Sequence, residues 1–279
     1  MSLKETATET LRIFDAGYFI APDGRRVDVQ PALKEAVEKT RLYTPEQASA
    51  LFQSLSSKPS QLPTIEVTAE TTQHAARRLV ESESVADLVL LNFASARNAG
   101  GGFINGARAQ EEDLCRCSGL YQCLISQRGY YDANRKQESA LYTDHLIYSP
   151  NVPWFRTRSR DDPDTLFLAS VITAPAPNAG VVLSRESDAL PKIEATLRRR
   201  AGLVLAVAAG NGHRTLLLGA WGCGVFRNDP ALVADAFGKW LESDKFDGAF
   251  DRVVFAIYDS SKDRATLSAF KQRFTGVEA

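Results

Sequence analysis

The stretch DLVLLNFASARNAGGGFINGARAQEE, residues 87–112, decides how the chain is interpreted. Its first eight residues, 87–94, are apolar at nearly every position, which is typical of a strand buried on both faces inside a sheet. A helical pattern begins at Gln110, so a loop with three consecutive glycines joins strand to helix. Open α/β sheets bind ligands at the carboxyl ends of their strands. The stretch therefore predicts an α/β fold with a binding site beside the glycines.

The rest of the chain beyond residue 63 repeats this alternation of strand and helix. Short apolar or β-branched runs predict further strands at residues 64–68, 166–173, 215–220 and 252–259. Helical patterns are present at residues 72–82, 110–127, 187–209, 230–242 and 261–274. Residues 142–164, rich in Pro, Arg and Asp, are predicted to leave the sheet. Such alternation predicts a three-layer α/β domain.

The first sixty residues differ from the rest of the chain. Residues 27–55 show roughly helical spacing of apolar positions, interrupted at Pro45, and so predict two helices. The segment SSKPSQLP, residues 56–63, has the Ser and Pro content of a linker. We therefore expect an N-terminal helical accessory region, residues 1–60, and a catalytic domain, residues 61–279.

Composition excludes several classes of protein. With 279 residues, 44% of them hydrophobic and 24% charged, the chain is in the globular range. A formal net charge of -1 gives no global field to recruit nucleic acid or an anionic membrane. The apolar runs are too short to span a bilayer, and residues 1–20 lack the apolar core of a signal peptide. Four cysteines, three bunched within nine positions, indicate reduced thiols, so we expect a cytoplasmic protein.

The glycines Gly100, Gly101 and Gly102 raise two alternatives. An ordered glycine run usually requires unusual backbone angles or the close approach of another molecule, but a flexible loop is also common.

The adjacent acids Glu111 and Glu112 are candidates for catalysis. Two neighbouring carboxylates raise each other's proton affinity when water is excluded, and a carboxyl kept protonated serves as a general acid. The structural alternative is an acidic first helical turn that suits the helix dipole.

A second glycine-rich loop, GAWGCGVFRNDP at residues 219–230, comes directly after a predicted strand. Asn228 or Asp229 followed by Pro230 predicts a helix start. Backbone amides near such a start favour phosphate, so the loop suits a diphosphate, with Phe226 against a sugar or base. A tight turn with packed Trp221 and Phe226 is the structural alternative.

Three blocks of sequence resemble one enzyme family. LNFASARNAGGGFINGARAQEE, SVITAPAPN and LGAWGCGVFRNDP occur in this order, and GGG precedes QEE by seven residues. They resemble the bacterial-type poly(ADP-ribose) glycohydrolases, over residues 64 to about 259. The resemblance implies a macrodomain-like three-layer α/β/α sandwich with a mixed central sheet and an N-terminal helical extension. It also implies hydrolysis of ribose–ribose bonds, without a metal or other cofactor, and poly(ADP-ribose), ADP-ribose and ADP-ribosylated proteins as ligands.

The resemblance also implies roles for individual residues. Glu112 is the implied catalytic acid, which protonates the leaving 2'-oxygen, and Glu111 orients the ribose. The implied substrate-binding residues are Asn98, Gly100, Gly101, Gly102, Gln110, Gly222, Cys223, Gly224, Val225 and Phe226. Glu70 and Thr71 follow the first strand of the core, where macrodomains commonly place an acidic residue that recognises adenine.

Other polar residues are given structural interpretations. The C-x-C-x5-C spacing of Cys115, Cys117 and Cys123 fits no common zinc site, and buried helical thiols are favoured. Cys223 has no histidine nearby in sequence, and none of His74, His145 and His213 is assigned to catalysis. The cluster of Arg156, Arg158 and Arg160 is either a solvated loop, which is favoured, or a contact for polymer phosphates.

Two further functions fit the same fold. One is a hydrolase of mono-ADP-ribosyl groups on protein or nucleic acid, which would use the same pocket. The other is a non-catalytic ADP-ribose-binding macrodomain, against which the paired acids argue. A nicotinamide-dependent oxidoreductase requires G-x-G-x-x-G after the first strand, which the sequence lacks.

Overall fold

The fold is built around one large mixed sheet. The structure, a computed structural model, describes residues 1–56 and 62–276, so residues 57–61 of the predicted linker lie outside the described residues. Within the described chain the large sheet has seven strands. In spatial order they are β3 (Arg41–Tyr43), β6 (Leu146–Trp154), β7 (Phe167–Ala174), β5 (Leu88–Phe93), β8 (Thr215–Gly219), β9 (Arg252–Ala256) and β4 (Thr64–Thr68).

The central strands are parallel and buried on both faces, as their apolar sequences predict. β5 pairs with β7 on one side and β8 on the other, and β9 lies between β8 and β4, all in parallel. Every residue of β8 and all but the last of β5 are buried. The five predicted strands are thus confirmed, and their carboxyl ends meet at one edge of the sheet.

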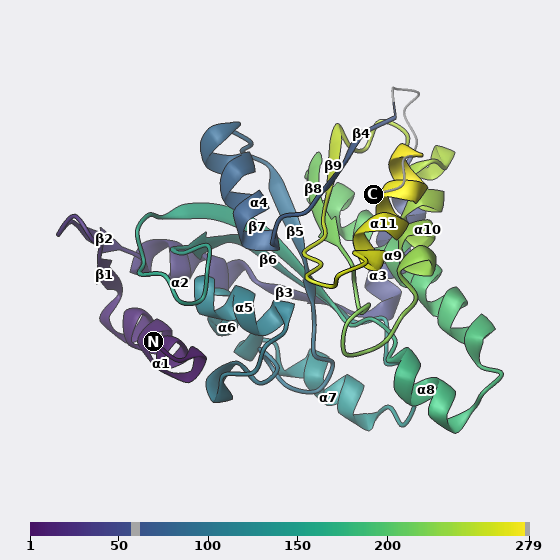
Figure 1. Ribbon diagram of the computed structural model, residues 1–279, viewed down its shortest axis with the longest axis horizontal. Helices are drawn as coiled ribbons and strands as arrows, with labels where there is room; N and C mark the ends of the chain where they lie inside the picture. The colour runs from purple at the N-terminus through teal and green to yellow at the C-terminus, as the bar shows by residue number, and fades with distance from the viewer. Residues whose placement is uncertain (57–61, 277–279) are drawn as a thin grey trace.

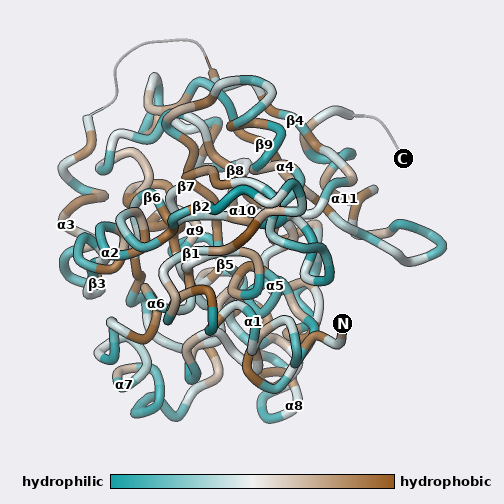
Figure 2. The backbone as a smooth tube through the Cα atoms, turned by 90° about the vertical axis from the view of Figure 1, so that its left-hand side faces the viewer, coloured by the Kyte–Doolittle hydropathy of each residue, from teal (hydrophilic) through white to brown (hydrophobic). Residues whose placement is uncertain are grey.

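Helices cover both faces of the sheet and complete two hydrophobic cores (Figure 1). One core is closed by α1 (Leu3–Ala16), α2 (Gln30–Lys39), α4 (Thr72–Arg77), α5 (Gln110–Cys117), α6 (Leu120–Ile125) and α7 (Arg128–Lys136). The opposite core is closed by α3 (Pro45–Ser54), α8 (Ala179–Arg185), α9 (Leu190–Gly210), α10 (Pro230–Leu241) and α11 (Ala265–Thr275). This arrangement is the predicted three-layer sandwich, and Figure 2 shows apolar segments along interior strands such as β8 and β9.

The described chain also has three short helical segments: η1 (Arg78–Ser82), η2 (Phe103–Asn105) and η3 (Asp244–Phe246). η1 is a π-helical continuation of α4, so the helix predicted at residues 72–82 is present in two parts. The helix predicted at residues 110–127 is divided into α5 and α6. Helices α1, α7 and α8 were not predicted.

The prediction that residues 142–164 leave the sheet is wrong for residues 146–154, which form β6. This strand pairs antiparallel with both β3 and β7. Its register shifts between Ser149 and Val152, and Asn151 there has φ of 47°. Pro150 lies in this irregularity, which is where a strand tolerates proline. Proline and polar residues therefore hide a strand whose other residues are mostly buried.

The N-terminal segment contributes directly to the sheet. The two predicted helices are α2 and α3, with Pro45 at the first position of α3, and β3 lies between them. A hairpin of β1 (Tyr18–Ile20) and β2 (Arg26–Asp28) comes after α1. Because β3 pairs with β6, this segment is part of the same sheet, and the division at residue 60 stays a prediction. Within the described chain, no helix is both long and apolar enough to cross a membrane.

Candidate active site

A cleft of about 970 Å³ lies over the carboxyl ends of the parallel strands. Residues at or just beyond the carboxyl ends of β4, β5, β8 and β9 contribute to its walls. They include Thr71, Phe93, Ala220, Cys223, Ala256 and Tyr258. A second cleft of about 750 Å³ shares Thr71 and Tyr258 with the first. The structure therefore places a ligand-sized cleft where the strand ends predict one.

The three glycines form a closely packed turn rather than a flexible loop. Gly100 and Gly101 have φ of 67° and 57°, in the left-handed region that favours glycine. A Cβ on Gly101 would overlap the carboxylate of Glu112, and one on Gly102 would lie 2.6 Å from Cβ of Ala107. The turn is held by the Gly101 amide, which donates to the Asn98 carbonyl over 3.0 Å. Only glycine lets the backbone pass this close to the acid.

Glu111 is buried at the base of this turn and held by protein donors. Asn92 Nδ2 donates to its Oε1 over 3.1 Å, and the Ser95 amide donates to its Oε2 over 2.8 Å. The side chain is 2% exposed. Burial raises the pKa of Glu111 to about 8, with a smaller contribution from the charge of Glu112, while the hydrogen bonds from Ser95 and Asn92 oppose the rise.

Glu112 has a different environment although it is the next residue. The Gly102 amide donates to its Oε1 over 2.9 Å, and within residues 1–56 and 62–276 this is the only hydrogen bond to the carboxyl group. The second oxygen, Oε2, has no hydrogen-bond partner among the described residues, and Glu112 as a whole is 8% exposed. Consecutive residues on a helix point in different directions, so one acid faces the sheet and the other faces the glycine turn.

Gln110 fixes the start of α5 to the end of β5. Its Oε1 accepts from the Phe93 amide over 2.8 Å, and its Nε2 donates to the Leu91 carbonyl over 2.9 Å. Because the oxygen and the nitrogen of the Gln110 side chain both form hydrogen bonds with β5, the two acids that follow are held at a fixed position relative to that strand. Gln110 also lines the main cleft.

The second glycine-rich loop also extends from a parallel strand and is anchored at its base. Gly222 has φ of 74°, and a Cβ there would lie 2.5 Å from Nδ2 of Asn228. That Nδ2 donates to the carbonyls of Pro177 and Gly222 over 2.8 and 3.1 Å. Asp229 caps α10 and Pro230 is its first residue, which confirms the predicted helix start.

The far part of this loop is more open. Cys223 and Gly224 line the cleft, and the side chain of Val225 is 78% exposed. Phe226 packs against Tyr142, with ring centroids 6.0 Å apart. Burial raises the pKa of the Cys223 thiol to about 12, so it is a poor nucleophile at neutral pH.

The remaining predicted residues lie at the edges of the site. Asn98 is exposed on the glycine turn. Thr71 caps α4 and lines both clefts, whereas Glu70 lies in the smaller one. Arg78 donates to both carboxylate oxygens of Glu70 over 2.9 and 2.7 Å, and this contact lowers the pKa of that acid.

Several residues that line the main cleft were not assigned to the site from sequence. Tyr258 and Asp259 come after β9, and the rule that ligands bind at strand ends could have identified them. Arg158 and Arg160 also line it. Arg156 does not fit the solvated-loop interpretation, because it is buried and its Nη2 lies 2.9 Å from Oε2 of Glu9 on α1.

The cysteines of α5 and α6 are buried free thiols, as predicted for Cys115, Cys117 and Cys123. Within the part of the chain that the structure describes, no group of three or more His, Cys, Asp or Glu residues could hold a metal ion. His213 bonds to the Tyr148 hydroxyl and the Asp87 carbonyl, close to the amino ends of the central strands.

Comparison with known proteins identifies the family. The family model "Microbial-type PARG, catalytic domain", where PARG is poly(ADP-ribose) glycohydrolase, matches residues 7–157. The chain belongs to this family. It is therefore a glycosidase that hydrolyses poly(ADP-ribose), as the resemblance implies.

Solved structures agree over nearly the whole chain. The glycohydrolase from Thermomonospora curvata is 44% identical, with a TM-score of 0.90, covering 98% of this chain and 99% of that one. Its complex with the inhibitor ADP-HPD has 43% identity, a TM-score of 0.88 and the same coverage. The enzyme from Deinococcus radiodurans in complex with ADP-ribose is 50% identical, with a TM-score of 0.80, covering 88% and 98%. None of the curated proteins matches the chain by sequence.

Proposed function

We propose that this enzyme cleaves the ribose–ribose O-glycosidic bond of poly(ADP-ribose) with Glu112 as general acid and releases ADP-ribose. The observation that supports this assignment is the geometry of the Glu112 carboxyl. Gly102 fixes Oε1, so the group is oriented, while Oε2 has no protein partner among the described residues. A general acid needs one oxygen within reach of the leaving group.

The reaction proceeds by protonation of the leaving oxygen. Glu112 transfers its proton to the 2'-oxygen of the adjoining ADP-ribose unit as the bond from that oxygen to C1'' breaks. The ribose then has oxocarbenium character, which nearby negative charge stabilises. The substrate's diphosphate supplies part of that charge. Water adds to C1'', and its proton passes to the Glu112 carboxylate, which restores the acid.

Glu111 orients the ribose in this scheme. Its pKa of about 8 leaves its carboxyl largely protonated at neutral pH, so it carries a hydroxyl that can donate to a sugar oxygen. Asn92 and Ser95 hold both of its oxygens, so its orientation is set before substrate binds. Asn98 and the glycine turn bind the sugar and phosphate from the other side.

The rest of ADP-ribose extends along the length of the cleft. We assign the diphosphate to the loop of residues 222–226, with Phe226 against the distal ribose. The adenine lies toward Thr71 and Glu70, at the end of β4. The cations Arg158 and Arg160 lie on the cleft wall, where they can meet polymer phosphates.

The cellular role is inferred from the chemistry. Removing ADP-ribose units reverses the modification of ADP-ribosylated proteins, and we propose that the enzyme does so in the cytoplasm after DNA damage. The four free cysteines agree with a reducing compartment. A deletion strain that shows no rise in polymer after damage would contradict this role.

The decisive experiment is release of ADP-ribose from purified poly(ADP-ribose) without added metal. The wild type should release it, and Glu112→Gln should bind ADP-ribose yet turn over about 10²- to 10⁴-fold more slowly. Parallel assays on mono-ADP-ribosylated protein and DNA measure the alternative substrates. Tight ADP-ribose binding without turnover on any of them would indicate a reader and overturn the proposal.

A further inference from the structure

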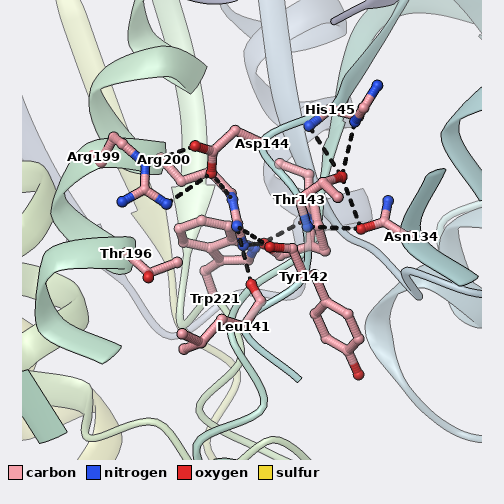
Figure 3. Close-up of polar contacts among 12 residues, drawn as sticks. Asn134, Leu141, Tyr142, Thr143, Asp144, His145, Thr196, Arg199, Arg200 and Trp221 are labelled. Carbon is pink, nitrogen blue, oxygen red and sulfur yellow. Dashed lines mark hydrogen bonds and ion pairs between the residues drawn. The ribbon is translucent and has the colours of Figure 1, made fainter. Parts of the chain in front are cut away.

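A buried arginine, Arg200, bonds to two loops that lie at the same edge of the sheet, one before β6 and one after β7 (Figure 3). Arg200 on α9 has a fully buried side chain. Its Nε donates to Oδ1 of Asp144 over 2.9 Å, and its Nη1 donates to the Pro175 carbonyl over 2.6 Å. Its Nη2 donates to the carbonyls of Leu141 and Tyr142 over 3.0 and 3.4 Å. One guanidinium thus fixes the loop before β6 and the end of β7.

The loop before β6 is held in a conformation that it would not adopt unaided. Tyr142 has φ of 59°, which is unfavourable for a residue with a bulky side chain. Asn134 Oδ1 accepts from the Thr143 amide and hydroxyl over 2.9 and 3.0 Å. The Asn178 amide donates to the Ala140 carbonyl over 2.9 Å, which joins the two loops again. The surrounding bonds therefore determine where the Tyr142 ring lies.

The Tyr142 ring is directed at Phe226. Their ring centroids are 6.0 Å apart with an interplanar angle of 42°. On the main chain, the Phe226 carbonyl accepts from the Gly180 amide over 3.0 Å. Figure 3 shows the ring extending away from the Arg200 guanidinium. Among the described residues, Phe226 is thus held by this backbone bond, by the hydrophobic core against which it packs, and by an aromatic neighbour on the loop that Arg200 bonds.

We propose that Arg200 and Tyr142 are positioning residues for the distal ribose: Arg200 fixes the Tyr142 loop, and Tyr142 fixes the ring of Phe226. This inference rests on the proposed assignment of Phe226 to that ribose. Arginine is required because its planar fork bonds a carboxylate and three carbonyls at once, which a lysine ammonium cannot reproduce. The unit acts through Phe226 and is not expected to contact the substrate.

The neighbouring Arg199 provides a matched control. It donates to the same Asp144 carboxylate, with its Nε over 2.6 Å and its Nη2 over 3.2 Å. Its side chain is half exposed, and its guanidinium bonds to Asp144 rather than to the carbonyls of the Tyr142 loop. Arg199→Gln therefore removes a cation from Asp144 while leaving the Tyr142 loop held by Arg200.

The test compares binding of ADP-ribose with binding of ADP, which lacks the distal ribose, by titration calorimetry. Tyr142→Ala should weaken ADP-ribose binding about 2- to 10-fold, the range for one aromatic pair, and leave the Kd of ADP unchanged. Arg200→Lys should show the same selective loss, and Tyr142→Phe should restore ADP-ribose binding. Arg199→Gln should match the wild type with both ligands.

A double-mutant cycle decides whether Tyr142 acts through Phe226. If it does, Tyr142→Ala should add little to the loss caused by Phe226→Ala. Additive losses, an equal loss of ADP and ADP-ribose affinity, or unchanged ADP-ribose binding in Tyr142→Ala would each overturn the inference. Tyr142 is half-buried on a loop, so its variants remain informative if Arg200→Lys fails to fold. Polymer hydrolysis by the wild type tests the proposed function separately.

Discussion

The two glycine-rich loops extend from neighbouring parallel strands, yet their environments differ. In the loop after β5, Gly100, Gly101 and Gly102 are each enclosed, and a Cβ on any of them would meet another side chain within 3 Å. In the loop after β8, Gly222 is enclosed, whereas a Cβ on Gly224 would have no neighbour within 4 Å among the described residues. The first loop holds an acid in place, and the second leaves room for a ligand.

The first loop is packed more tightly than the second because the two loops are assigned different tasks: one positions an acid and the other binds a diphosphate. Proton transfer depends on the position of the acid to within a fraction of an ångström, so its surroundings are fixed before substrate binds. A diphosphate is bound by several backbone amides and tolerates small adjustments of the loop. The anchored bases of both loops and the exposed Val225 agree with this division.

Among changes to the two loops themselves, the largest expected effect comes from filling the space beside the acid. Gly101→Ala forces a left-handed backbone on alanine and drives its methyl group into the Glu112 carboxylate, so kcat/KM for polymer should fall about 100-fold. Gly212→Ala is the control. Its φ is 80°, but apart from its own chain neighbours no atom of the described residues lies within 4 Å of the added Cβ, so it should cost about 1 kcal/mol of stability and leave turnover intact. Equal activity in the two variants would contradict the assigned role of this packing.

The next effect concerns the buried acid Glu111 and is measured as the change in the free energy of unfolding with pH. The pKa of Glu111 is raised by burial from 4.5 to about 8, so the folded protein binds a proton that the unfolded chain releases between these values. Glu111 therefore stabilises the fold below pH 4.5 relative to higher pH, and this contribution is lost as pH rises toward 8. The slope is up to about 1.4 kcal/mol per pH unit.

Glu111→Gln should remove that slope. Urea unfolding at about pH 5, 6.5 and 8, values that span the shifted range, would show the free energy of unfolding of the wild type falling relative to that of the variant. The exposed Glu138→Gln controls for the substitution itself. Parallel slopes for the wild type and Glu111→Gln would show that Glu111 does not titrate in this range.

Features with a local sequence signal could be predicted, whereas features that depend on tertiary contacts could not. The central strands and the strand-to-helix loops are predictable from continuous apolar runs and glycine positions, which are local signals. β6 was missed because Pro150 interrupts its pattern, and its strand state depends on pairing with β3 and β7. The raised pKa of Glu111 could not be predicted either, because it depends mainly on how deeply the fold buries that carboxyl group. Likewise, the partners of Arg200 come from loops far apart in sequence.

The smallest expected effect concerns the open loop. Val225 is 78% exposed, so Val225→Ala removes little packing and should leave the melting temperature unchanged. If bound ADP-ribose covers this side chain, losing its two methyl groups should weaken binding about 2- to 5-fold. Calorimetric titration with ADP-ribose measures the affinity, and a thermal melt without ligand measures the stability. A lower melting temperature with unchanged affinity would reverse the comparison, because it would make the loop after β8 a structural support rather than a surface open to the ligand.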